Sequence, residues 1–429
     1  MSFFEIDKRL QSLNKQALSM AKPRFDEIDR VTEYNQQKVL AAFIRHRVSE
    51  AHLGGSTGYG YGDAGRETLE HIMADCMGAE DALIRHSFAS GTHTLTVALF
   101  GLLRPNDRVL CLTGRPYDTI QGVFGINGQS DGSLAEFGVL YDEVPLREDG
   151  TPDLAGIRAA LCENPCAVAY IQRSRGYATR PSLTVDDIEV LCKLVKEVSP
   201  DTVVMVDNCY GEFVEMKEPC EAGADLVAGS LIKNPGGGIA PSGGYIAGRH
   251  DLVERCAHRM TCAGVGREVG ATLGNNRELF MGLFSAPHVV GEALKTAVYT
   301  AALFSLLGFS VSPRVEEKRG DIIECVTLGT EKGLIAFCRG MQSGAPVDSF
   351  VVPEPWAMPG YDDPVIMAAG AFTGGASIEL SADGPLRPPY AAWMQGGLNF
   401  HSAKTGVLLA AQSMLNAGAL NLSEQEKNG

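Results

Sequence analysis

The sequence of 429 residues lacks several features that would assign it to a special class of protein. It has no run of 18 or more apolar residues, so we expect no transmembrane helix. The first ten residues, MSFFEIDKRL, lack the basic and apolar regions of a secretory signal, so a cytoplasmic location is expected. Positive charge is also scarce, because 37 Lys and Arg against 52 Asp and Glu give a net charge of −15. This acidic balance disfavours binding to nucleic acid or to an anionic membrane surface.

The cysteines lack the close pairing that is typical of zinc sites. The chain has 11 of them, scattered, and the closest pair is Cys162 and Cys166, without an accompanying histidine cluster. We therefore expect free thiols that pack as small apolar side chains. No metal site is predicted.

What the chain does contain is an alternation of strands and helices. Its length points to two or three domains. Short β-branched runs at 109–112, 167–171 and 203–207 are separated by helical segments such as 185–196. This alternation predicts an α/β fold, a mostly parallel sheet with helices on both faces.

Beyond residue 290 the pattern changes to a smaller α+β domain. An apolar helix is predicted at 293–307, and strands are predicted near 334–338 and 377–380. An amphipathic helix at about 25–50 and a second helix at 67–77 precede the alternating region. The predicted domains are an N-terminal helical arm at 1–65, a large α/β domain at 66–290 and a small C-terminal domain at 291–429.

Lys233 lies in an apolar segment that ends in glycines, AGSLIKNPGGG at 228–238. A lysine that attacks an aldehyde needs a lowered pKa, which burial supplies, and close backbone access, which glycine supplies. Ser230, three residues earlier, is placed to reach a phosphate oxygen. For this segment alone, an exposed lysine on an ordinary turn is the commoner case.

Asp207 ends the apolar run VVMVD. In open α/β sheets ligands bind outside the carboxyl ends of the strands, where an acid can hydrogen-bond a pyridinium nitrogen and keep the ring protonated. The alternative is a helix N-cap.

Two further segments complete the pattern. SFASGTHT at 87–94 opens a helix, and a helix N-terminus is a ready phosphate site, although a simple Ser/Thr cap looks the same. Tyr117 follows the 109–112 strand and can stack on a cofactor ring or simply pack. Together, at successive strand ends, these residues predict pyridoxal phosphate held as a Schiff base on Lys233.

At this point the sequence resembles the fold-type-I pyridoxal-phosphate enzymes of cysteine and methionine metabolism. Within them it is most similar to the aluminium-resistance family related to cystathionine β-lyase and methionine γ-lyase. The resemblance extends from about residue 30 to 415 and rests on YGYGDAGR (59–66), SGTH (90–93), DNCYGEF (207–213), SLIKNPGGG (230–238) and SIELSADGPLRPP (377–389). It implies that Lys233 forms the Schiff base and Asp207 contacts the pyridinium. It also implies that Ser90, Gly91, Thr92 and Ser230 hold the phosphate and that Tyr117 stacks on the ring.

The chain departs from the wider group at three places. Ile232 stands where a threonine usually precedes the lysine. The Tyr-x-Arg pair that a neighbouring subunit usually supplies reads Tyr59-Gly60-Tyr61 here, and the nearest arginine is Arg66. We therefore expect Tyr59 and Tyr61 among the catalytic residues and Arg66 at the cofactor.

The third departure is Glu379, which holds the place of the arginine that grips the substrate carboxylate. Arg387 in the same segment is the first candidate for this role, with Arg173 and Arg175 as rivals. For each of the three the alternative is an exposed surface arginine.

The predicted function is a carbon–sulfur lyase that acts on a sulfur-containing amino acid. Lys233 would remove the Cα proton, and a thiol would then leave from the β or γ carbon. Alternatives are an aminotransferase, decarboxylase or aldolase, a non-catalytic cofactor-binding protein, and a cofactor-free structural protein. The match of GYGDAG (60–65) to GxGxxG is weak evidence for a nicotinamide enzyme, because no strand precedes it. The resemblance implies a homodimer or a dimer of dimers.

Overall fold

The computed structural model describes residues 3–128, 131–357 and 363–422. The chain forms two compact units that interleave along the sequence. The large unit comprises Val31–His288 and Arg319–Asp321, and the small unit comprises Met1–Arg30, Val289–Lys318 and Ile322–Gly429. Helices α1 (Lys8–Arg45) and α8 (Asn276–Leu306) each begin in one unit and end in the other. The predicted division after residues 65 and 290 stays a prediction.

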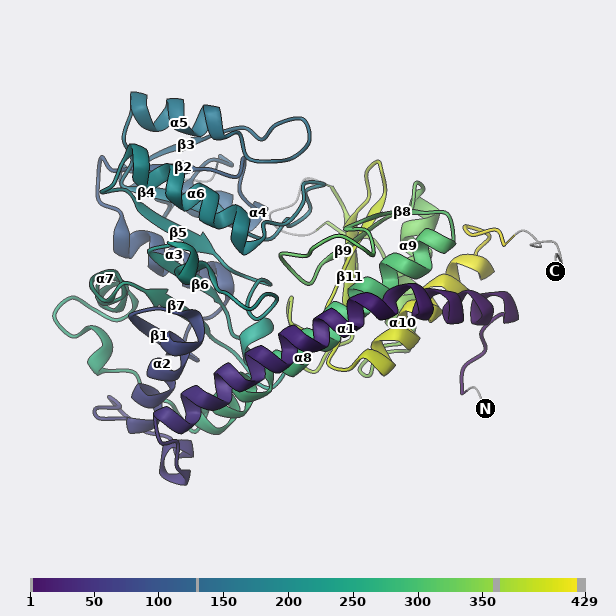
Figure 1. Ribbon diagram of the computed structural model, residues 1–429, viewed down its shortest axis with the longest axis horizontal. Helices are drawn as coiled ribbons and strands as arrows, with labels where there is room; N and C mark the ends of the chain where they lie inside the picture. Colours follow the sequence, from purple (N-terminus) through teal and green to yellow (C-terminus); the bar gives the residue numbers. More distant parts are fainter. Residues whose placement is uncertain (1–2, 129–130, 358–362, 423–429) are drawn as a thin grey trace. The chain divides into compact units, whose positions relative to one another are not determined.

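The large unit is built on a seven-stranded sheet (Figure 1). Strands β2 to β6 are parallel to one another, whereas β7 is antiparallel to both β6 and β1. The order across the sheet is β1 (Asp81–Arg85), β7 (Gly244–Gly248), β6 (Leu226–Ser230), β5 (Val203–Asp207), β4 (Val168–Gln172), β2 (Arg108–Cys111) and β3 (Leu140–Glu143). The predicted mostly parallel α/β fold is confirmed, and three of these strands coincide with the β-branched runs of the sequence.

Helices cover both faces of this sheet. One apolar core joins alternate side chains of the strands, such as Leu83, Tyr170 and Met205, to α3, α4 and α7. Strands β1, β4 and β6 are buried along their whole length, as expected for strands that are covered on both faces. The helices are α2 (Ala64–Met77), α3 (Gly91–Leu102), α4 (Asp118–Phe124), α5 (Leu154–Glu163), α6 (Val185–Val198) and α7 (His250–Met260), with short 3₁₀ turns η1 (Glu50–Leu53), η2 (Pro219–Ala222), η3 (Asn234–Gly236) and η4 (Gly266–Glu268).

The small unit contains an antiparallel five-stranded sheet. Its order is β10 (Val365–Ala368), β11 (Ser381–Pro385), β12 (Ala391–Gln395), β9 (Glu324–Thr327) and β8 (Ser310–Ser312), with helices α9 (Glu331–Ser343) and α10 (Phe400–Asn416). The predicted α+β class is confirmed, but both strand positions are wrong.

The first wrong strand, 334–338, lies inside α9. Leu334, Phe337, Cys338 and Met341 are all buried and follow the i, i+3, i+4, i+7 spacing of one helix face. The five-residue apolar run LIAFC hides this period, because a short apolar run fits either structure. The second wrong strand, 377–380, is a bend, and the real strand β11 begins one residue later at Ser381.

One helix of the described residues, α8, is long and apolar enough to cross a membrane by length and composition alone. Its most apolar window is 78% buried inside the protein, which is the environment of a core helix rather than of a lipid-facing one.

Candidate active site

The candidate site lies at the carboxyl ends of the neighbouring strands β5 and β6. Asp207 is the last residue of β5, and Ser230 is the last residue of β6. The two strands pair in parallel, with Asp207 opposite Ala228, so both residues emerge at the same edge of the sheet. Lys233 follows after a tight turn in which its amide N–H donates to the Ser230 carbonyl over 3.3 Å. A Cβ on Gly236 would overlap the Leu231 carbonyl oxygen, so this turn requires glycine.

The Lys233 ammonium lies over an aromatic ring that the sequence did not single out. Its Nζ is 3.5 Å from the ring centroid of Tyr210, and the lysine side chain is half-buried. Burial lowers the pKa of Lys233, but Tyr210, Cys209 and Asp207 raise it by more, so the net shift is upward. The expectation of a lowered lysine pKa is therefore wrong for the protein without cofactor, because burial is outweighed by the partners of the charge.

Asp207 is a buried carboxyl, 9% exposed. One oxygen accepts from the backbone N–H of Cys209 (3.1 Å) and the other from the hydroxyl of Tyr170 (3.3 Å). Burial raises its pKa, while these hydrogen bonds and the charge of Lys233 oppose the rise. A buried acid in this state gains most from a second cation beside it, and a protonated ring nitrogen is such a cation.

A cradle for an anion adjoins these residues. Ser230 is 1% exposed, and its hydroxyl oxygen has no hydrogen-bond partner among the described residues. A Cβ on Gly91, the first residue of α3, would lie 3.2 Å from the Ser230 Cβ and 3.5 Å from the Cys209 sulfur. The first turn of α3 therefore faces the ends of β5 and β6. Its free N–H groups and the unpartnered hydroxyl are suited to a phosphate.

The other predicted phosphate and ring contacts have additional partners. The Ser90 hydroxyl caps α3 by accepting from the His93 N–H (3.1 Å). The hydroxyls of Thr92 and Thr119 are 2.9 Å apart. Tyr117, half-buried, begins α4, donates its N–H to Gln172 (2.7 Å) and meets Tyr177 edge to face.

The predicted substrate arginines have different surroundings. Arg173 is fully buried and donates to Asn208, to the carbonyls of Leu183 and Gly211, and to Glu215. Arg175 is 1% exposed, so the alternative of a surface arginine is wrong for both. The donors of Arg173 are engaged inside the large unit, which favours a structural role.

Arg387 belongs to the small unit, where it forms an ion pair with Asp363 (3.0 Å) and stays half exposed. Glu379, in the same segment, is 4% exposed and accepts from the N–H groups of Phe372 (2.9 Å) and Thr373 (2.8 Å). A carboxylate at this position therefore shapes the preceding loop, a task that an arginine could not perform.

Tyr59, Tyr61 and Arg66 lie on a loop that is fixed within the large unit. The Arg66 guanidinium is buried and donates to the carbonyls of Gly60 and Gly270, both over 2.8 Å. Tyr59 and Tyr61 remain 73% and 67% exposed. The loop thus presents the tyrosines outward and keeps the arginine inside.

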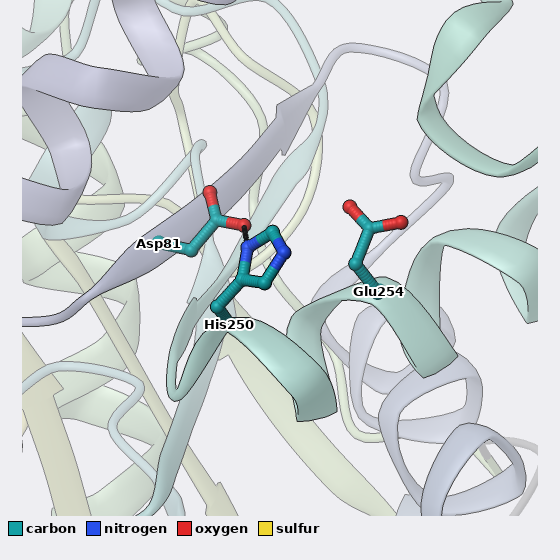
Figure 2. Close-up of side chains that lie close together, drawn as sticks. All are labelled: Asp81, His250 and Glu254. Atoms are coloured by element: carbon teal, nitrogen blue, oxygen red, sulfur yellow. Dashed lines mark hydrogen bonds and ion pairs between the residues drawn. The ribbon is translucent and has the colours of Figure 1, made fainter.

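A separate cluster of Asp81, His250 and Glu254 brings three possible metal ligands together (Figure 2). His250 Nδ1 lies 2.7 Å from Asp81. However, Arg267 donates to both oxygens of Asp81 (3.1 and 2.8 Å) and forms an ion pair with Glu254 (2.7 Å). A cation already neutralises the two acids, so the cluster is an ion-pair network, and the absence of a metal site stays a prediction.

The chain is similar to a known protein family and to a curated relative over most of its length. A family model described as methionine gamma-lyase matches residues 10–415. Protein YnbB of Bacillus subtilis (strain 168) is 49% identical over 391 residues, which are 91% of this chain and 92% of the relative.

Two solved structures are similar over nearly their full length. One is a carbon–sulfur lyase involved in aluminium resistance from Clostridium novyi NT, with 48% identity, a TM-score of 0.92 and coverage of 95% of this chain and 96% of that chain. The other, from Clostridium acetobutylicum, is described as a candidate cystathionine beta-lyase involved in aluminium resistance (47% identity, TM-score 0.93, 96% of each chain).

Sheet order, paired strand ends and these neighbours define the fold of the fold-type-I pyridoxal-phosphate enzymes. The chain belongs to the methionine gamma-lyase family. The predictions of this family and of a lyase-class enzyme are confirmed.

Proposed function

We propose that the protein is a pyridoxal-phosphate-dependent carbon–sulfur lyase that acts on a sulfur-containing amino acid. One observation carries the proposal: Lys233, the buried Asp207 and the unpartnered hydroxyl of Ser230 converge at the ends of two adjacent strands. The carbon–sulfur lyases and the methionine gamma-lyase family to which the chain is related support the same chemistry.

The residues present fit the cofactor. Lys233 would hold it covalently, and Asp207 would face its ring nitrogen. The first turn of α3 and Ser230 would hold the phosphate, which explains a buried hydroxyl that otherwise lacks a partner. Tyr117 would cover the ring face. When bound, pyridoxal phosphate supplies an aldehyde for amines and an electron-withdrawing ring that acidifies the Cα proton of an amino acid.

The chain's own residues would then move one proton. Lys233, once its amine is released, takes the Cα proton onto Nζ, and its short tether keeps the amine close to the substrate. The carbon–sulfur bond breaks, and the same proton is available to the departing sulfur. With one water consumed, the products are a thiol, a keto acid and ammonia. Asp207 would stay negative throughout and would keep the ring nitrogen that it faces protonated.

Substrate recognition rests on the remaining arginines. Arg173 is fully buried and engaged in hydrogen bonds within the large unit, so Arg387, which stays half exposed, is the better candidate for the substrate carboxylate, with Arg175 as a rival. We further propose a cytoplasmic homodimer or dimer of dimers in which the exposed Tyr59 and Tyr61 reach a neighbouring copy.

An absorbance spectrum tests the cofactor directly. The protein purified with pyridoxal phosphate should show a near-visible band, and Lys233→Ala should lose both the band and turnover. Lys22→Ala, a change at a lysine whose side chain is 74% exposed, is the matched control and should keep both. A band that persists in Lys233→Ala would exclude Lys233 as the attachment site.

A product screen on L-cystathionine, L-cysteine and L-methionine tests the reaction. Keto acid and ammonia formed without an amino acceptor indicate a lyase. Turnover only with an added keto acid indicates an aminotransferase, which the same cradle can support. A bound cofactor without any product indicates a binding protein.

A further inference from the structure

The contact between Lys233 and Tyr210 stands out because the tyrosine backbone is in a disfavoured conformation. Tyr210 has φ of 69°, in the left-handed region that bulky side chains rarely adopt, and it is buried. Such conformations persist only where the surrounding structure holds them, and they gather at functional sites. The side chains around Tyr210 must therefore hold this conformation.

Arg173 fixes the turn from one side. Its guanidinium donates to the Asn208 side chain over 2.7 Å and to the Gly211 carbonyl over 2.9 Å, so it brackets Tyr210 between its two contacts. A Cβ on Gly211 would lie 2.5 Å from the Arg173 side chain, so the turn and the arginine are in close contact. Arg173, which the sequence suggested as a ligand of the substrate carboxylate, thus stabilises the backbone conformation of Tyr210 instead.

Two buried acids fix the turn from the other side. Glu218 accepts the Phe213 N–H over 2.8 Å, and Glu212 accepts the Tyr245 hydroxyl over 2.9 Å. The Asn234 side chain donates to the Glu212 carbonyl over 2.9 Å. Because Asn234 directly follows Lys233, one hydrogen-bond network holds both the turn with the lysine and the turn with the tyrosine.

The result is a ring face fixed under an amine. An ammonium 3.5 Å from the centre of an aromatic ring is attracted by the negative face of the ring, most strongly where water is excluded. We propose that Tyr210 is a positioning residue whose ring face holds the Lys233 ammonium in the cofactor-free protein, and holds it again once the released amine has taken a proton.

In the proposed reaction, on which this inference rests, the lysine is covalently held, is then released, and later returns. A free lysine chain has many rotamers, so a fixed ring that holds the released amine keeps it near the reacting carbon. The ring face also attracts the ammonium that forms once the released amine has taken the Cα proton.

The test uses the full-length protein without cofactor and measures the acetylation rate of Lys233 by acetic anhydride from pH 8 to 12. Peptide mass spectrometry follows Lys233, with exposed Lys22 as the internal reference. Only the neutral amine reacts, so the midpoint of the rate against pH reports the lysine pKa. Tyr210→Asn removes the ring but tolerates the left-handed backbone. It should lower the midpoint by about half to one pH unit, a roughly threefold to tenfold change in the neutral fraction.

Two variants make the result specific. Tyr210→Phe keeps the ring face and should leave the midpoint where it is in the unmodified protein. Tyr141→Leu removes a tyrosine from the edge strand β3 and should have no effect on Lys233. An unchanged midpoint in Tyr210→Asn, or an equal fall in Tyr141→Leu, overturns the proposal. If Tyr210→Asn does not fold, a fall of the same size in Tyr210→Phe overturns it.

Since no cofactor is present in this experiment, its outcome is independent of the absorbance test of Lys233. A cofactor band together with an unchanged midpoint rejects only the role of Tyr210. A lowered midpoint without any band supports the contact and rejects the proposed cofactor.

Discussion

At the scale of single residues, a change at Ser230 should affect the stability of the fold and the binding of the cofactor in opposite directions. Its buried hydroxyl has no partner among the described residues, so it weakens the cofactor-free fold unless a ligand satisfies it. Ser230→Ala should therefore leave the melting temperature of the cofactor-free protein unchanged or raise it. The same change should weaken pyridoxal phosphate binding roughly threefold to tenfold, the worth of one hydrogen bond. Thermal melts and a cofactor titration measure the two effects. A lower melting temperature with unchanged affinity would contradict this role.

Glu212 links the site to pH. Its side chain is fully buried, and burial raises its pKa to about 8, with the charge of Glu218 adding to the rise and Tyr245 and Arg173 opposing it. The unfolded chain releases this proton near pH 4.5, whereas the folded protein retains it until about pH 8. Stability from Glu212 is thus complete at low pH and is lost as pH rises through this window, on the order of 1 kcal/mol per pH unit.

Glu212→Gln removes the titrating carboxyl, so this site no longer contributes to the pH dependence of stability. Urea unfolding of the cofactor-free protein between pH 5 and 8 should show a smaller loss of stability for the variant than for the unmodified chain. The comparison is needed because burial also raises the pKa of Asp207 and Glu218, which contribute to both proteins alike. Glu148→Gln, on an exposed loop, is the control and should follow the unmodified protein. Parallel curves for all three proteins would rule out a protonated Glu212.

At the scale of elements, the loop that carries Tyr59 and Tyr61 depends on Arg66. A charged donor buried against two carbonyls stabilises the loop by roughly 1.5–3 kcal/mol per hydrogen bond. Arg66→Gln should therefore increase local opening, and chymotrypsin should cleave after Tyr59 and Tyr61 about ten times faster or more. Arg158→Gln breaks an exposed ion pair with Glu197 and should leave the cleavage rate unchanged. Equal rates for both variants would show that the loop does not depend on Arg66.

The same scale shows what the sequence could and could not predict. Asp207 and Lys233 were predictable, because a strand-ending acid and a glycine-flanked lysine are local patterns whose meeting point follows from parallel-sheet geometry. Tyr210 lies in the segment DNCYGEF (207–213), but the sequence did not reveal that it contacts Lys233. Its orientation depends on a left-handed turn held by Arg173, a residue distant in sequence. The net rise of the Lys233 pKa was missed for the same reason, since partners and not burial decide it.

The predicted strand at 334–338 failed differently. Local composition favoured a strand, while the helical period became visible only over the longer span that includes Met341. The burial of Arg173 and Arg175 was also unpredictable, because buried arginines are rare and the acids that accompany them come from distant segments.

At the scale of the whole molecule, apolar side chains on the large unit remain uncovered. Helices α1 and α8 pack together there, since Gln36 donates to the Phe284 carbonyl (2.8 Å) and Phe43 meets the Phe284 ring edge to face. Their outer side leaves four large side chains exposed, which we call the α1–α8 surface: Leu40, Ile44, Met281 and Phe284. Soluble monomers rarely expose clustered apolar groups, so a second copy of the chain is the expected cover.

This surface allows the proposed oligomer to be tested without altering the site. The side chains of Ile44 and Met281 are 69% and 57% exposed in the single chain, so replacing both by glutamate costs little stability there. In a dry interface between two copies, the same double variant would bury two unpaired charges. The double variant should shift from a dimer or tetramer to a monomer in light scattering and retain its melting behaviour at low concentration. Val190→Glu, at an exposed valine of α6, is the control and should keep the assembly. If Tyr59 and Tyr61 act in a neighbouring copy, the monomer should also lose turnover while Lys233 still binds cofactor. A double variant that remains assembled would assign the interface to another surface.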